Sequence, residues 1–166
     1  MARVGNSSSN LSGGDKYDLL IFKFTDGYPV GNIKLAFGET PKRISGVQKV
    51  SQIFTKVLMS RKSSDVLYTS SGTDFSDFSS FSNVSDADGY RVRSEIESAV
   101  YSAETQAKYI LNFPGASYES QLDSVEILGV SVNGDNVSVQ IKILTKAGEE
   151  APIALPFTSL GIEVNE

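Results

Sequence analysis

The feature that most constrains the fold of this chain is a run of alternating apolar and polar residues between Val125 and Leu144. The second half of the run has an apolar residue at every second position: Val137, Val139, Ile141 and Ile143. Such alternation places the apolar side chains on one face of a β-strand. A turn sequence, Asn133-Gly134-Asp135-Asn136, divides the run in the middle. The pattern therefore predicts a prominent β-hairpin near the C-terminus.

The first strand of this hairpin contains an irregularity. Its apolar residues change parity, from Val125 and Ile127 to Val130 and Val132. One extra residue at Leu128-Gly129 accounts for the change, and glycine tolerates the backbone of a bulge. We therefore expect a β-bulge at this point.

Two helices are expected before the hairpin. The first covers Val47 to Leu58, where apolar residues recur every three or four positions, and Ser45 and Gly46 can start it. The second runs from about Asp88 to Asn112 and is stopped by Pro114-Gly115. The predicted fold class is α+β, with two amphipathic helices packed on a small, mostly antiparallel sheet.

The remaining segments set the expected domain boundaries. Residues 1–14 are rich in Ser, Asn and Gly and predict a flexible N-terminal arm. Residues 15–150 form a single α+β domain, in which extended segments are expected at Tyr17–Phe24 and Ile33–Phe37. Residues 151–166 are expected to be an extended C-terminal tail, because Pro152 and Pro156 argue against a central strand.

Composition excludes several functions. The chain has no histidine and no cysteine, so His-containing triads, thiolate chemistry and most zinc sites are absent. Its net charge of −5, without a basic cluster, argues against a nucleic-acid partner. No apolar run reaches the length of about 20 residues that spans a bilayer. We expect no cofactor, no metal, no nucleic acid and no membrane contact.

Several acidic residues are candidates for chemical sites. A calcium loop can be aligned on Asp86, Asp88, Gly89 and Glu95, but its first position would be Val84, which cannot coordinate. Carboxylate pairs for a carbohydrate hydrolase can be drawn from Glu95, Glu97, Glu119 and Asp123. Helix capping and solvated surface charge explain these residues more simply. No catalytic residue is assigned, and conversion of Glu95, Glu97 or Glu119 to Gln is expected to remove no hydrolytic activity.

Two apolar features have both a structural and a functional interpretation. One is the phenylalanine triplet, which is either a partner-binding stripe or part of the core, and we favour the core: Phe75, Phe78 and Phe81. The edges of the hairpin also have two interpretations. In the first, an edge is covered within the molecule by the segment from Leu19 to Phe24; in the second, an edge pairs with a strand of a neighbouring protein. The second interpretation makes Val137, Val139, Ile141 and Ile143 partner-binding residues, together with Ile153, Leu155 and Phe157 of the tail.

The order of these elements resembles the small lysozyme-like wedge proteins of contractile phage tail baseplates, a group that includes sheath initiators. The resemblance covers roughly residues 33 to 157. It is carried by Val47-Gln48-Lys49-Val50 with Gln52-Ile53, by Gly72-Thr73-Asp74-Phe75, by the long second helix, and by the spacing of Glu119, Leu122, Val125 and Ile127. Of a Glu-Pro-Arg triplet found in the family, only Glu119 is matched, within Tyr118-Glu119-Ser120.

The resemblance implies a structural protein without enzymatic activity. Such a subunit belongs to the inner baseplate of the virion, is assembled in the host cytoplasm, and is present in multiple copies in a symmetric assembly. It binds other wedge proteins and the tail tube, and presents a strand to the tail sheath protein, with Glu119 as a further contact residue. The alternatives are an adaptor domain unconnected to tails, which binds a peptide by strand addition, and a carbohydrate hydrolase.

Overall fold

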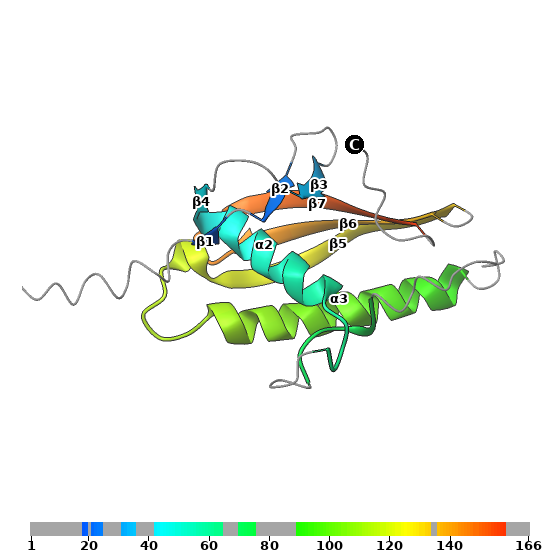
Figure 1. Cartoon of the computed structure of the whole chain (residues 1–166), viewed down its shortest axis with the longest axis horizontal. Coiled ribbons are helices and arrows are strands. Elements are labelled where there is room, and N and C mark those ends of the chain that lie inside the picture. The colour runs from blue at the N-terminus through cyan, green and yellow to red at the C-terminus, as the bar shows by residue number, and fades with distance from the viewer. Residues whose placement is uncertain are drawn as a thin grey trace, which may run out of the picture.

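The computed structural model describes residues 18–19, 21–24, 31–35, 42–64, 70–75, 89–133 and 136–158. These residues form an α+β fold with two helices and two sheets (Figure 1). The helices are α2 (Gly46–Met59) and α3 (Gly89–Leu111). The short strands are β1 (Asp18–Leu19), β2 (Phe22–Phe24), β3 (Gly31–Leu35) and β4 (Arg43–Ile44). The C-terminal half contributes a single 3-10 turn (Tyr118–Ser120) and the longer strands β5 (Leu122–Asn133), β6 (Asn136–Thr145) and β7 (Glu150–Thr158).

The predicted hairpin is confirmed as the β5–β6 pair. The two strands are antiparallel, and their register closes at Asn133 opposite Asn136. The register shifts between Ile127 and Gly129, which confirms the predicted bulge, and shifts again between Leu122 and Ser124. The larger, five-stranded sheet has the order β2-β3-β7-β6-β5. All neighbouring strands in it are antiparallel except β3 and β7.

The prediction of an extended tail after residue 150 is wrong for residues 151–158, which lie in β7. This strand pairs with β6 from Glu150 to Thr158, and with β3 at Ile153 and Ala154. Pro152 and Pro156 have the same parity, so their nitrogens point to the same side of β7. Because the register with β6 continues through both prolines, we place the missing N–H groups on the β3 side, where pairing is short. A proline therefore does not exclude an inner strand if its nitrogen faces the less paired side.

The N-terminal strands also differ from expectation. Leu19 to Phe24 does not cover the hairpin, because β7 occupies that position in the sheet. Instead β1 pairs with β4 in a separate two-stranded sheet, and β2 pairs with β3. The Gln52 side chain on α2 holds the segment after β1: its amide nitrogen donates to the Leu19 carbonyl (2.7 Å), and its oxygen accepts from the Ile21 N–H (2.6 Å).

Both predicted helices are confirmed within two residues of the expected ends. In Figure 1, α2 crosses in front of the sheet and α3 runs along its β5 side. The core between these layers is apolar. It contains Val50, Phe54 and Leu58 of α2, Val92, Ile96, Val100 and Leu111 of α3, and Val125, Val139, Ile141, Ile143, Ile153 and Leu155 of the sheet. Burial of these side chains is the main stabilising contribution to the fold.

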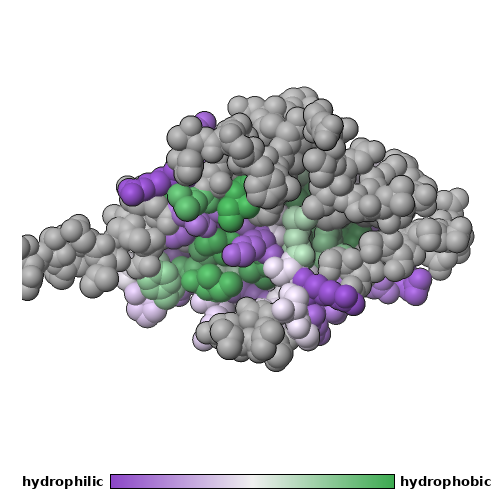
Figure 2. Space-filling view, viewed as in Figure 1, coloured by the Kyte–Doolittle hydropathy of each residue, from purple (hydrophilic) through white to green (hydrophobic). Residues whose placement is uncertain are grey.

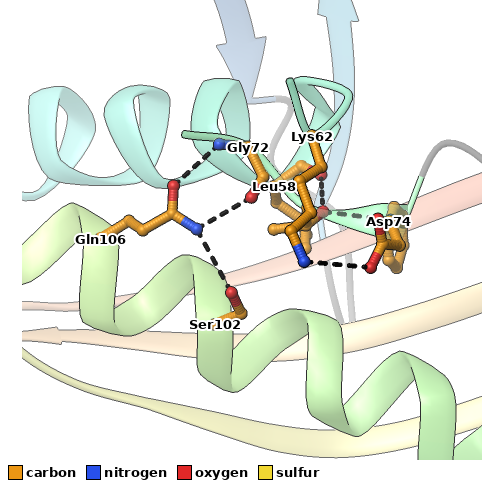
Figure 3. A network of polar contacts seen from close by, with 8 residues as sticks. Leu58, Lys62, Gly72, Asp74, Ser102 and Gln106 are labelled. Atoms are coloured by element: carbon orange, nitrogen blue, oxygen red, sulfur yellow. Dashed lines mark hydrogen bonds and ion pairs between the residues drawn. The ribbon is translucent and has the colours of Figure 1, made fainter. Parts of the chain in front are cut away.

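The connection after α2 is fixed by backbone contacts at Gly72 and Thr73. The Thr73 carbonyl accepts a hydrogen bond from the Lys62 N–H, and the Thr73 N–H donates to the Ser60 carbonyl. From α3, the Gln106 side chain bonds both the N–H and the carbonyl of Gly72, at 2.8 Å each (Figure 3). Phe75, which follows, is buried, as the core interpretation predicted. Phe78 and Phe81 lie outside the described residues, as do Asp86, Asp88 and the N-terminal arm 1–14.

Candidate interaction surfaces

The central position of β6 removes most of the predicted strand-donor residues from the surface. β6 is paired with β5 on one side and β7 on the other, so it has no free edge. Its side chains Val139, Ile141 and Ile143 are fully buried, and Ile153 and Leu155 of β7 are nearly so. Val137 and Phe157 are placed opposite each other in the β6–β7 ladder. The five buried side chains therefore belong to the core and do not form a contact surface.

Among the described residues the five-stranded sheet ends at β2 on one side and at β5 on the other, and the outer side of β5 is its longer edge. The first part of this edge is poorly suited to pairing. It contains two bulges and the exposed carboxylates Asp123 and Glu126, features that interrupt or discourage strand addition. From Val130 to Asn133 the register is unbroken, and the sequence has neither charge nor proline. We call residues 130–133 the hairpin-tip edge.

The face of the hairpin opposite the helices carries a charged pair. Lys142 on β6 and Glu126 on β5 are cross-strand partners, with Nζ and Oε2 2.7 Å apart. The hydrogen bond and charge of Glu126 raise the pKa of Lys142 above its ordinary value. Since Lys142 is already protonated at neutral pH, any stabilisation by this pair is present there and is lost only as the pH rises through the raised pKa.

The other end of the ribbon, where α3 leads into β5, exposes large apolar side chains. Ile110, Phe113 and Tyr118 are 50%, 36% and 69% exposed. Phe113 and Tyr118 line the same shallow hollow, and Tyr118 also borders a second hollow formed with the β6–β7 turn. We call Ile110, Phe113 and Tyr118 the aromatic end. Glu119, the contact residue implied by the family resemblance, is exposed beside Tyr118.

A rigid framework supports the aromatic end. The Asn112 side chain donates to the Leu122 carbonyl (2.8 Å) and accepts from the Leu122 N–H (2.9 Å), so it pairs with this residue as a neighbouring strand would. Gln121 donates to the Ala116 carbonyl and accepts from Lys146 Nζ. The connection between α3 and β5 is therefore held at both ends, and the aromatic side chains project from a fixed backbone.

A second framework contact joins this end of the sheet to α2. The Ser45 side chain does not cap the helix; instead Glu149, in the β6–β7 turn, accepts the N–H of Val47 at 3.0 Å. A carboxylate at this place also interacts favourably with the helix dipole. No local pattern in the sequence indicates these roles of Glu149 and Asn112, because their partners are defined only by the folded chain.

We expect Asn112→Ala to destabilise the protein by about 1–3 kcal/mol, because the N–H and carbonyl of Leu122 lose their side-chain partner in a partly buried position. Urea denaturation measures this change. Phe113→Ala is the neighbouring control, since Phe113 is exposed and has no comparable clamp. Equal stability of Asn112→Ala and the wild type would contradict a clamping role.

Other predicted site residues are dispersed. Glu97 forms an ion pair with Arg93 (2.9 Å), and none of Glu95, Glu97, Glu119 and Asp123 is buried. Within the described ranges, no group of His, Cys, Asp and Glu is arranged to hold a metal ion. The same residues include no helix long and apolar enough to cross a membrane. On the face that carries α2, hydrophobic residues are interspersed with hydrophilic ones (Figure 2).

Comparison with known families, curated proteins and solved structures finds no match to this chain. The resemblance to baseplate wedge proteins therefore rests on the pattern of the sequence. What the geometry adds is the position of two surfaces, the hairpin-tip edge and the aromatic end.

Proposed function

We propose that the protein is a structural, non-enzymatic subunit of a contractile phage tail baseplate, which joins neighbouring proteins and presents a strand to the first ring of sheath. The observation that supports this most is the placement of its two candidate surfaces. The aromatic end lies where β5 begins, and the hairpin-tip edge lies where β5 ends. A subunit that joins two neighbours needs separate contact regions of this kind.

The two surfaces are suited to different contacts. Tyr118 and Phe113 offer aromatic area on a fixed backbone, which favours docking against the side chains of another wedge or tube protein. The hairpin-tip edge offers main-chain groups at the spacing of a β-strand, and an added strand sets the register of the protein that donates it. In this proposal the sheath strand pairs with residues 130–133 of β5, and not with β6 or β7.

The hairpin-tip edge is tested by proline at two adjacent positions, Ser131 and Val132. Successive residues of a strand direct their N–H groups to opposite sides, so one of the two prolines disrupts the β6 ladder and the other affects only the outer edge. The variant that keeps a cooperative unfolding transition is the edge variant. We expect it to enter baseplates and to fail in starting sheath assembly, as seen by electron microscopy after co-expression with the tail proteins of the same genome.

The aromatic end is tested in the same system with Phe113→Ala combined with Tyr118→Ala. We expect this protein to fold and to be absent from purified baseplates. Leu128→Ala is the control, since Leu128 is 46% exposed and lies between the two surfaces. If the wild-type protein does not enter a tail structure, the baseplate function is wrong. If the folded edge variant still starts sheath assembly, strand presentation by β5 is wrong while the structural function remains.

A further inference from the structure

The connection between α3 and β5 forms a shallow hollow directly after Leu111, the last residue of the helix. Residues 112–118 and Gln121 line this hollow, and none of them is charged. We call it the loop hollow. Two of its lining residues, Phe113 and Tyr118, have exposed aromatic side chains and belong to the aromatic end. Their backbone is held in place, so the hollow has a fixed wall of aromatic character.

The end of α3 gives the loop hollow a negative potential. The last carbonyl groups of a helix point beyond its carboxyl end and form the negative end of its dipole. The Lys108 carbonyl accepts the N–H of Asn112. The next three carbonyls, of residues 109–111, accept no hydrogen bond from any described part of the chain. A positively charged group in the hollow is therefore favoured.

The sequence around the loop hollow is acidic. Residues 109–141 include no lysine and no arginine, but they include four acidic residues: Glu119, Asp123, Glu126 and Asp135. Glu119 follows Tyr118 directly and is exposed. Asp123 is also exposed and lines the second hollow together with Tyr118. These carboxylates disfavour an acidic partner and favour a basic one.

Two lysines lie near the loop hollow without lining it. Lys108 of α3 is paired with Glu104, at 2.7 Å. Lys146 donates to the side-chain oxygen of Gln121, at 2.8 Å, and lines the second hollow. The second hollow is therefore the less suitable of the two for a cation, because the charge of Lys146 would repel it.

We infer that the loop hollow binds an arginine side chain of the neighbouring protein that docks on the aromatic end. The face of an aromatic ring attracts a cation. The guanidinium group is planar and weakly hydrated, so it can stack on a ring and also donate to the carbonyls at the end of α3, whereas the lysine ammonium is a strongly hydrated point charge. The inference rests on the docking role of the aromatic end in the proposed function, and it adds the chemistry of the partner.

Binding can be measured by NMR on the isolated full chain, with the tripeptide acetyl-Gly-Arg-Gly-amide as the probe. Two matched peptides carry citrulline, which has nearly the same shape without the charge, or lysine in place of arginine. We expect the arginine peptide to shift the amide signals of residues 112–118. It should bind about tenfold more tightly than the citrulline peptide and about threefold more tightly than the lysine peptide.

Variants test whether the aromatic rings form the site. Phe113→Leu combined with Tyr118→Leu keeps two apolar side chains without rings, and should weaken arginine binding by about tenfold with thermal unfolding unchanged. Tyr101→Leu is the matched control, since Tyr101 is an exposed tyrosine of α3 outside the hollow. It should leave arginine binding unchanged.

Several results would overturn the inference. Equal binding of the citrulline peptide would show that charge is not recognised, and equal binding of the lysine peptide would show that stacking is not. An arginine peptide that does not shift residues 112–118, or that binds the folded double variant as tightly as the wild type, would place no arginine site in the hollow. These measurements use no tail protein, so a chain that binds arginine but enters no tail structure keeps this site and loses only the baseplate function.

Discussion

Shortening the chain after Glu150 should leave it without a cooperative unfolding transition. The deletion removes most of β7, the strand between β6 and β3, and with it Ile153 and Leu155, which are 1% and 2% exposed. Loss of a buried Ile or Leu side chain alone costs about 2–5 kcal/mol, and the deletion also removes the β6–β7 ladder. Thermal and urea denaturation followed by circular dichroism measure the effect.

Two further variants separate loss of the strand from loss of its side chains. Ile153→Ala should remain folded but lose about 3–4 kcal/mol, as expected for a cavity in the core. Pro152→Ala, at an exposed neighbouring position, should change stability by about 0.5 kcal/mol or less. A chain that ends at Glu150 and still unfolds cooperatively would mean that β7 is a dispensable tail after all.

The second large effect is expected for Gly72→Ala. Gly72 has φ +89, and a Cβ added there would lie 2.6 Å from the Ser60 carbonyl oxygen and 2.7 Å from that of Arg61. Both are backbone atoms at the end of α2, where Thr73 is also bonded, so neither can move away cheaply. We expect a loss of about 3–4 kcal/mol, from left-handed strain together with overpacking.

Gly115→Ala is the matched control for this substitution. Gly115 has nearly the same φ, +92, but a Cβ there would meet no atom within 4 Å. Its expected cost is about 1–2 kcal/mol, from backbone strain alone. The difference between the two variants in urea denaturation isolates the close approach of Gly72 to the end of α2. Equal losses of stability in the two variants would show that Gly72 is not in close contact with the end of α2 in solution.

The helices and the hairpin could be predicted because the periodicity of apolar residues that identifies each of them lies within a short stretch of sequence. The apolar stripe from Val47 to Leu58 and the alternation from Val137 to Ile143 each define one face of one element. The bulge at Leu128-Gly129 was predictable for the same reason: the parity changes within the strand itself.

The sheet order could not be predicted in this way. Pro152 and Pro156 argued against an inner strand, but the sequence does not say to which side a proline nitrogen points, nor that β3 would pair with β7 only briefly. The backbone hydrogen bonds made by the side chains of Gln106 and Asn112 could not be predicted either. The sequence around an amide side chain does not indicate which distant backbone group it will bind. The prediction of a free edge on β6 was wrong for the same reason, because the edges of a sheet depend on which strands pair with one another.

The parallel pairing of β3 with β7 has a consequence for the order of folding during synthesis. Gly31 is placed opposite Ile153, so β3 cannot join the sheet until β7, far along the chain, has left the ribosome. Contacts between such distant parts of a chain form slowly, because a long loop must close first. The β2–β3 pair should therefore join the sheet only after β7 has been synthesised, when the β5–β6 hairpin is already formed.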